Sequence, residues 1–123
     1  MLLTQKETKA LTAKILSMVK ADDANASVGS NRRSHLRFAR NDVLTSGTNE
    51  GRSASVTVWI GGRRGSASTN DLDDASLRQM VEQAEAIAQN APIDRDYVPT
   101  LGKQTYRPSN RFFRSTAQLS LTA

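Results

Sequence analysis

The stretch from Ser53 to Pro92 constrains the fold most, because it reads in unbroken order as strand, turn, strand and helix. Gly61-Gly62 can form a tight turn, since glycine adopts positive φ without steric cost. Arg64 to Thr69 is then expected to return as the partner strand. The strand before the turn has apolar residues at every second position, the period of a half-buried strand: Val56, Val58 and Ile60.

An amphipathic helix is predicted after this hairpin. Asn70 or Asp71 is expected to cap it, with Asp73-Asp74 in the first turn, where the helix dipole favours anions. Asn90 and Pro92 are expected to end it. The apolar positions recur at helical spacing and predict one buried face: Leu77, Val81, Ala84, Ile87 and Ala88.

The first half of the chain predicts another helix followed by short strands. Thr4 and Glu7 fit a capping box for a helix that reaches about Lys20. Arg40-Asn41-Asp42 is a turn signal, and Ser46 to Gly51 is expected to be a loop. The segments around these signals alternate in polarity and predict three strands: Ala24 to Val28, one around Leu36 and Phe38, and Val43 to Thr45.

This order of elements predicts an α+β fold. About five short strands joined as hairpins would form an antiparallel sheet, and the two helices would pack on one face of it. The periodic residues of the strands and helices are expected to fill the core between these layers: Val56, Val58, Ile60, Leu36, Phe38, Leu11, Ile15, Val81, Ala84 and Ile87.

Composition narrows the class of protein. A chain of 123 residues fits one domain, and with no cysteine it has neither disulfides nor thiolate metal ligands. No apolar run approaches the roughly 20 residues that cross a bilayer, and the start does not resemble a secretory signal, so we expect a cytoplasmic protein without a membrane partner. The net charge is +5, but residues 1–90 hold 12 basic and 10 acidic residues, which argues against nucleic acid as a partner.

Two segments carry a resemblance to a known family. RRSHLRFARNDVLTSGT and VTVWIGGRRGSASTNDLD look like parts of the N-terminal domain of the TldD/PmbA family, whose members are metallopeptidase-related and were once described as modulators of DNA gyrase. The resemblance covers roughly Leu2 to Tyr106. We therefore expect a TldD/PmbA-like domain over residues 1–106 and a divergent, disordered tail over residues 107–123.

The resemblance also implies a function. Peptidase-type members carry a zinc motif, His-Glu-x-x-x-His, downstream of this domain, whereas this chain has one histidine, His35. We expect no catalytic, metal or cofactor-binding residue here, and zinc only in a full-length peptidase-type relative. The implied role is a non-catalytic N-terminal domain, or a truncated product, that shapes access of peptide substrates and contributes to subunit contacts. Its partners would be the C-terminal region of the parent protein or a homologous subunit in a homo- or hetero-oligomer.

A candidate interaction surface follows from exposed basic and aromatic residues: Trp59, Arg33, His35, Arg37, Arg63 and Arg64. Side chains alternate along a strand, so Arg33, His35 and Arg37 are expected to share one sheet face. Arginines on such a face are usually only solvated, and His35 is expected to be a solvent-facing strand residue. The alternative function is a free-standing module whose arginine face binds an acidic protein or nucleic acid. Trp59 is expected either to be covered by another segment or to lie at an interface.

Overall fold

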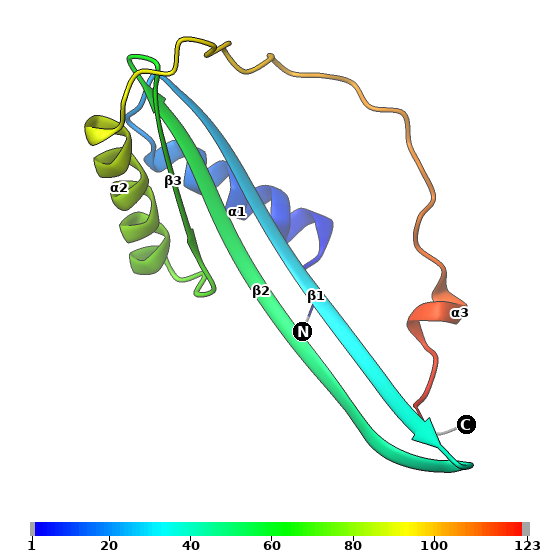
Figure 1. Cartoon of the computed structure of the whole chain (residues 1–123). Coiled ribbons are helices and arrows are strands. Elements are labelled where there is room, and N and C mark those ends of the chain that lie inside the picture. The colour runs from blue at the N-terminus through cyan, green and yellow to red at the C-terminus, as the bar shows by residue number, and fades with distance from the viewer. Residues whose placement is uncertain (1, 122–123) are drawn as a thin grey trace. The chain divides into compact units, whose positions relative to one another are not determined.

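The computed structural model describes residues 2–121. In chain order the elements are α1 (Gln5–Met18), β1 (Asp23–Ala39), β2 (Asp42–Ile60), β3 (Arg63–Thr69), α2 (Asp74–Asn90) and the single turn α3 (Arg114–Ala117) (Figure 1). The chain divides into two compact units. We call the first, the residues up to Asn31 together with Glu50–Thr100, the base. The second contains Arg32–Asn49, which we call the arm, and the residues from Leu101 onward.

The expected α+β class is confirmed: the strands form one sheet in the order β1-β2-β3, and β2 and β3 are antiparallel. The expected number of strands is corrected from about five to three. β1 joins the first two predicted strands into one of 17 residues. β2 runs for 19 residues through Ser46–Gly51, which the sequence predicted as a loop. Pairing between long strands supplies the backbone hydrogen bonds that this polar segment would otherwise take from water.

Both predicted hairpin turns are present. Gly61 and Gly62 have φ of 56° and 74°, and Ile60 pairs directly with Arg63 across them. Arg40 and Asn41 have φ of 53° and 59° between β1 and β2. Two successive residues at positive φ make the turn type whose twist matches that of paired strands.

Side-chain caps begin both long helices. Thr4 caps α1 through the predicted capping box: its hydroxyl accepts from the Glu7 amide at 3.2 Å, and the Glu7 carboxylate accepts from the Thr4 amide at 2.7 Å. The cap of α2 is Asp73, which accepts from the Ser76 amide at 2.7 Å. The expected caps Asn70 and Asp71 were wrong, because the helix begins at Asp74 and only the residue before it can reach that amide.

The core lies between the sheet and the two helices. Alternate residues of β2 face α2, and α1 adds one fully buried side chain, Ile15. Both helices therefore pack on the same face of the sheet, as predicted. Ile60 and Leu11 are partly buried against this core. The buried residues are Ile15, Ala54, Val56, Val58, Leu77, Met80, Val81, Ala84 and Ala88.

Three residues predicted for the core are exposed instead. Phe38 is 71% exposed and Leu36 is 41% exposed, because both lie in the arm, where the strands carry no buried side chain. Ile87 is 45% exposed, because it lies at the margin of the apolar stripe of α2, whereas Met80, which the sequence did not assign to the core, is buried. The periodicity of the sequence predicts which face of a strand or helix carries a side chain. It does not predict whether another element covers that part of the face.

Helix and sheet approach each other closely at Gly65 of β3, which is buried. A Cβ at this position would lie 2.0 Å from the carbonyl oxygen of Ala84 and 2.5 Å from the amide nitrogen of Ala88. Glycine and the small side chains of α2 thus let the backbones of β3 and α2 meet directly. The helices found in the described residues include none long and apolar enough to cross a membrane.

Candidate interaction surface

Trp59 lies on the face of β2 opposite Val58 and is half-buried. Its ring packs against that of Tyr97, with centroids 5.9 Å apart and planes tilted by 31°. Arg64 is directly opposite Trp59 in the hairpin register and is exposed. The structure therefore brings Trp59 and Arg64 together on the outer face of the sheet, and a segment distant in sequence covers part of the indole.

Asp23 at the start of β1 holds that segment in place. Its carboxylate accepts hydrogen bonds from the Thr100 amide at 2.8 Å, the Thr100 hydroxyl at 2.5 Å and the Tyr97 hydroxyl at 2.9 Å. The Thr100 hydroxyl, followed by its amide, holds the pKa of Asp23 below its usual range. Partial burial and then the hydrogen bond to Asp23 raise the pKa of Tyr97. Ionised Asp23 thus fastens residues 97–100 to the sheet.

Acid should release this segment. A carboxyl with a lowered pKa in the folded state stabilises that state above its unfolded pKa, and the stabilisation is lost as the pH falls through the folded pKa. We expect the fluorescence of Trp59, the sole tryptophan, to change with a midpoint below the ordinary aspartate range. Asp23→Asn should show the released signal already at neutral pH. An acid transition that survives unchanged in Asp23→Asn would show that another group holds Tyr97.

Arg63 is hydrogen-bonded to another residue of the base. Its guanidinium donates to the carbonyl of Ala91, the residue that follows α2, and its side chain is half-buried. Arg63 also forms an isolated bridge with Ile93, and the next amide, that of Asp94, donates to Gly62 at 2.9 Å. The side chain therefore satisfies an acceptor at the helix C-terminus, where a cation is favoured.

The other three candidates lie in the arm. Arg33, His35 and Arg37 are exposed and alternate along β1, so they share one face of the strand. The imidazole of His35 lies over Gly47 of β2, where a Cβ would come 2.9 Å from its Cε1 atom. The Ser34 and Thr48 hydroxyls are hydrogen-bonded at 3.0 Å across the two strands. The six candidates thus form two groups, one in the base and one in the arm.

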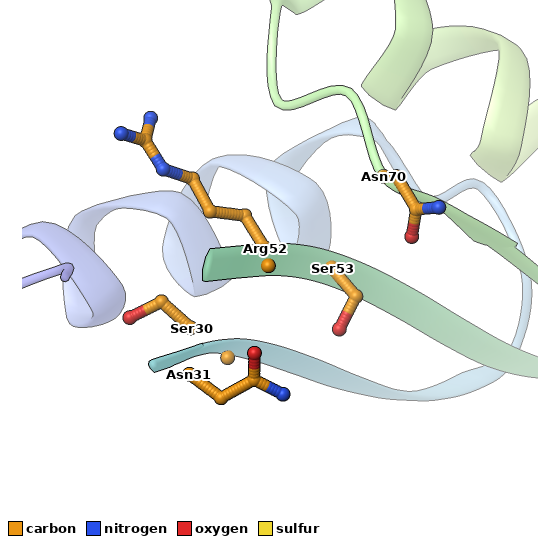
Figure 2. Close-up of a pocket in the computed structure, with 7 residues that line it drawn as sticks. Ser30, Asn31, Arg52, Ser53 and Asn70 are labelled. Carbon is orange, nitrogen blue, oxygen red and sulfur yellow. The ribbon is translucent and has the colours of Figure 1, made fainter. Parts of the chain in front are cut away.

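Sequence reasoning missed a polar pocket of about 340 Å³ in the base. Figure 2 shows the Ser53 and Asn70 side chains pointing the same way, whereas the Arg52 guanidinium is directed away from them. The hydroxyl of Ser30 accepts from the Leu3 amide at 2.8 Å. No motif marks these residues, since strand order alone gathers them, and their polar groups do not converge on one point. The lining consists of Gly29, Ser30, Asn31, Gly51, Arg52, Ser53 and Asn70.

Metal ligands do not cluster in the part of the chain that the structure describes: no three His, Cys, Asp or Glu side chains lie together as a metal site requires. His35 lies on the exposed arm, and the carboxylates of Asp73 and Glu7 serve as helix caps. The described residues therefore offer surfaces for contact and small pockets, of which the one beside Ser53 is polar.

Comparison with known proteins relates this chain to one family and to a solved structure. The model of the family described as PmbA/TldA metallopeptidase domain 1 matches residues 24–88, more than half of the chain. The crystal structure of TldE from Thermococcus kodakarensis is similar with a TM-score of 0.63 and 19% identity, over 82% of this chain and 23% of the solved chain. The present chain thus spans about a quarter of that relative. No curated protein matches it. On the family match over β1, β2, β3 and α2, the chain belongs to the PmbA/TldA metallopeptidase domain 1 family.

Proposed function

We propose that this chain acts as a non-catalytic domain of a TldD/PmbA-type metallopeptidase, where it shapes access of peptide substrates and contributes to subunit contacts. The observation that carries the proposal is the family match over residues 24–88, which covers the whole hairpin system and most of α2. The similar solved chain is about four times longer than the part that this chain matches. Hydrolysis of peptide bonds is then assigned to residues other than those described here.

The arm supports a role in contacts. A two-stranded ribbon is at best marginally stable in water by itself, and three or more strands or a packed helix are normally needed. Here both strands of the arm are exposed along almost their whole length. They carry four exposed large apolar side chains, which a partner surface would cover: Leu36, Phe38, Val43 and Leu44. Exposed apolar surface of this kind is typical of interaction sites.

A binding module for an acidic partner is the second candidate, and the arm is again the observation that favours it. The arm contains four arginines and a single acidic residue, Asp42. The charge balance of the whole chain does not reveal this local excess of positive charge, because most of the carboxylates lie in the base. Retention of nucleic acid at physiological salt would favour this candidate, since contacts made only through charge weaken steeply as salt rises.

We expect the purified chain to cleave no peptide. Catalytic zinc normally takes three protein ligands and leaves one position open for water, and the single imidazole of His35 cannot supply such a set. The measurement is hydrolysis of an unfolded polypeptide with zinc added, compared with His35→Ala. Cleavage by the wild type that is lost in His35→Ala would overturn the assignment as a non-catalytic domain.

A further inference from the structure

Charge is divided unequally between the two compact units. The base holds nine basic and eleven acidic residues, whereas the second unit holds eight basic residues and one acidic residue, Asp42. The second unit therefore has a net charge of +7 and the base one of −2, which together give the +5 of the whole chain. The near-balance over residues 1–90, which argued against nucleic acid as a partner, sums the basic arm with the acidic base and so does not reveal this unit.

The arm contributes a polar, cationic face. Arg33 and Arg37 lie on the same side of β1 with His35 between them, and all three side chains are exposed. Because a strand rises about 3.3 Å per residue, the Cα atoms of the two arginines are roughly 13 Å apart. Each guanidinium can therefore bind a different phosphate of one strand of nucleic acid. The excess of positive charge suits a partner with regularly spaced anionic groups.

The C-terminal segment, the residues from Leu101 onward, interleaves basic and aromatic residues. It contains no acidic residue, and its first three cations recur at every fourth position: Lys103, Arg107 and Arg111. Nucleic-acid bases stack on aromatic rings and on guanidinium planes, while the cations pair with phosphates. Three rings of the segment each stand beside an arginine in sequence and are 62–83% exposed: Tyr106, Phe112 and Phe113.

We propose that the second unit binds single-stranded nucleic acid, with the arginines of the arm on the phosphates and the rings of the C-terminal segment stacked on bases. The proposal rests on the second candidate function and names its partner, and it is independent of any role in peptide hydrolysis. Neither kind of contact involves the sugar, so ribose and deoxyribose strands should bind alike.

The kind of cation favours nucleic acid over other anionic partners. Seven of the eight basic residues of the second unit are arginines, whose planar guanidinium binds phosphate through two hydrogen bonds and also stacks on flat rings. The exposed rings would find bases on a single strand, whereas a surface of carboxylates offers nothing on which to stack. Segments that bind anionic lipids typically cluster about 4–8 cations on or beside a long helix, whereas α3 has four residues.

The two kinds of contact can be separated with two probes. A fluorescent deoxythymidine strand of about 20 nucleotides would be titrated with the full chain and followed by anisotropy. An abasic strand of the same length is the matched probe, because it keeps the phosphates and lacks the bases. We expect the deoxythymidine strand to bind at least about tenfold more tightly, since each stacked base adds to the affinity. A uridine strand of equal length should bind as tightly as the deoxythymidine strand.

Matched variants assign the contacts to residues. Phe112→Ala should weaken binding of the deoxythymidine strand about tenfold and leave the abasic strand unaffected, whereas Val98→Ala, at an exposed position of the base, should affect neither. The double variant Arg33→Gln/Arg37→Gln should weaken binding of both strands and reduce the slope of log affinity against log salt by about 0.7 per arginine. Arg78→Gln, on the exposed side of α2, should leave that slope unchanged.

Equal affinity for the deoxythymidine and abasic strands would overturn the proposal, and so would binding that disappears at about 0.15 M salt, because contacts made through charge alone weaken steeply with salt. Tighter binding to polyglutamate would reject nucleic acid but keep a module for an acidic protein, so failure here is distinct from failure of the second candidate function. Tighter binding to phosphatidylserine vesicles would also overturn the proposal, since it would mean a membrane surface as the partner.

Discussion

Gly65→Val should unfold the base at room temperature. Any Cβ at this position would meet the carbonyl oxygen of Ala84 at 2.0 Å and the Ala88 amide nitrogen at 2.5 Å, and both belong to the backbone of α2. Flexible side chains can relieve an overpacked site for about 1–3 kcal/mol, but a helix backbone can yield only if α2 separates from β3. Much of the core would separate with it, since five of the buried residues lie on α2. The measurement is thermal unfolding followed by circular dichroism.

Gly29→Ala is the matched control for Gly65. Gly29 also lies in a strand, but a Cβ there would meet nothing within 4 Å, and its φ is negative. The alanine should leave stability unchanged or raise it by about 0.4–1 kcal/mol, because it restricts the unfolded chain. A Gly65→Val protein that melts together with Gly29→Ala would mean that α2 does not pack on β3 as described.

Val58→Asp is expected to cost several kcal/mol, on the order of the whole stability of a small domain. Val58 is fully buried between the sheet and α2, and among the described residues no buried polar or charged side chain is available to pair with a carboxylate. Ser55→Asp places the same charge on the exposed face of the same strand and should be nearly neutral. Chemical denaturation of the three proteins checks this. Equal denaturation midpoints for Val58→Asp and the wild type would show that Val58 does not lie in the core.

Local chemistry in the sequence was enough to predict the cap of α1 and the two hairpin turns. The capping box of Thr4 and Glu7, the Gly61-Gly62 turn and the turn at Arg40-Asn41 each depend on groups within a few residues of one another. The face that each strand residue occupies also followed, because side-chain alternation is strict. Val56 and Val58 lie on the face of β2 that was predicted to be buried, and both are buried.

What could not be predicted depends on partners far along the chain. Asp23 shows no motif, since its hydrogen-bond donors Tyr97 and Thr100 lie more than 70 residues away. Arg63 was assigned to a surface, but a carbonyl 28 residues away accepts from its guanidinium. Leu36 and Phe38 were assigned to the core because alternation gives the face of a strand but not how far the covering helices extend.

The extent of the core bears on function as well. The three apolar residues misassigned to it are among those that remain exposed in the fold: Leu36 and Phe38 on the arm and Ile87 on α2. Exposed apolar side chains are typical of interaction sites where they form a contiguous patch.

The central claim is that this domain contributes contacts and no catalytic centre, and zinc stoichiometry tests it most directly. The purified wild-type chain would be equilibrated with zinc, dialysed and subjected to elemental analysis together with His35→Ala. We predict far less than one zinc per chain, with the same trace amount in both proteins. One zinc per chain in the wild type that is absent from His35→Ala would contradict the claim, because it would require a metal site built around the single histidine.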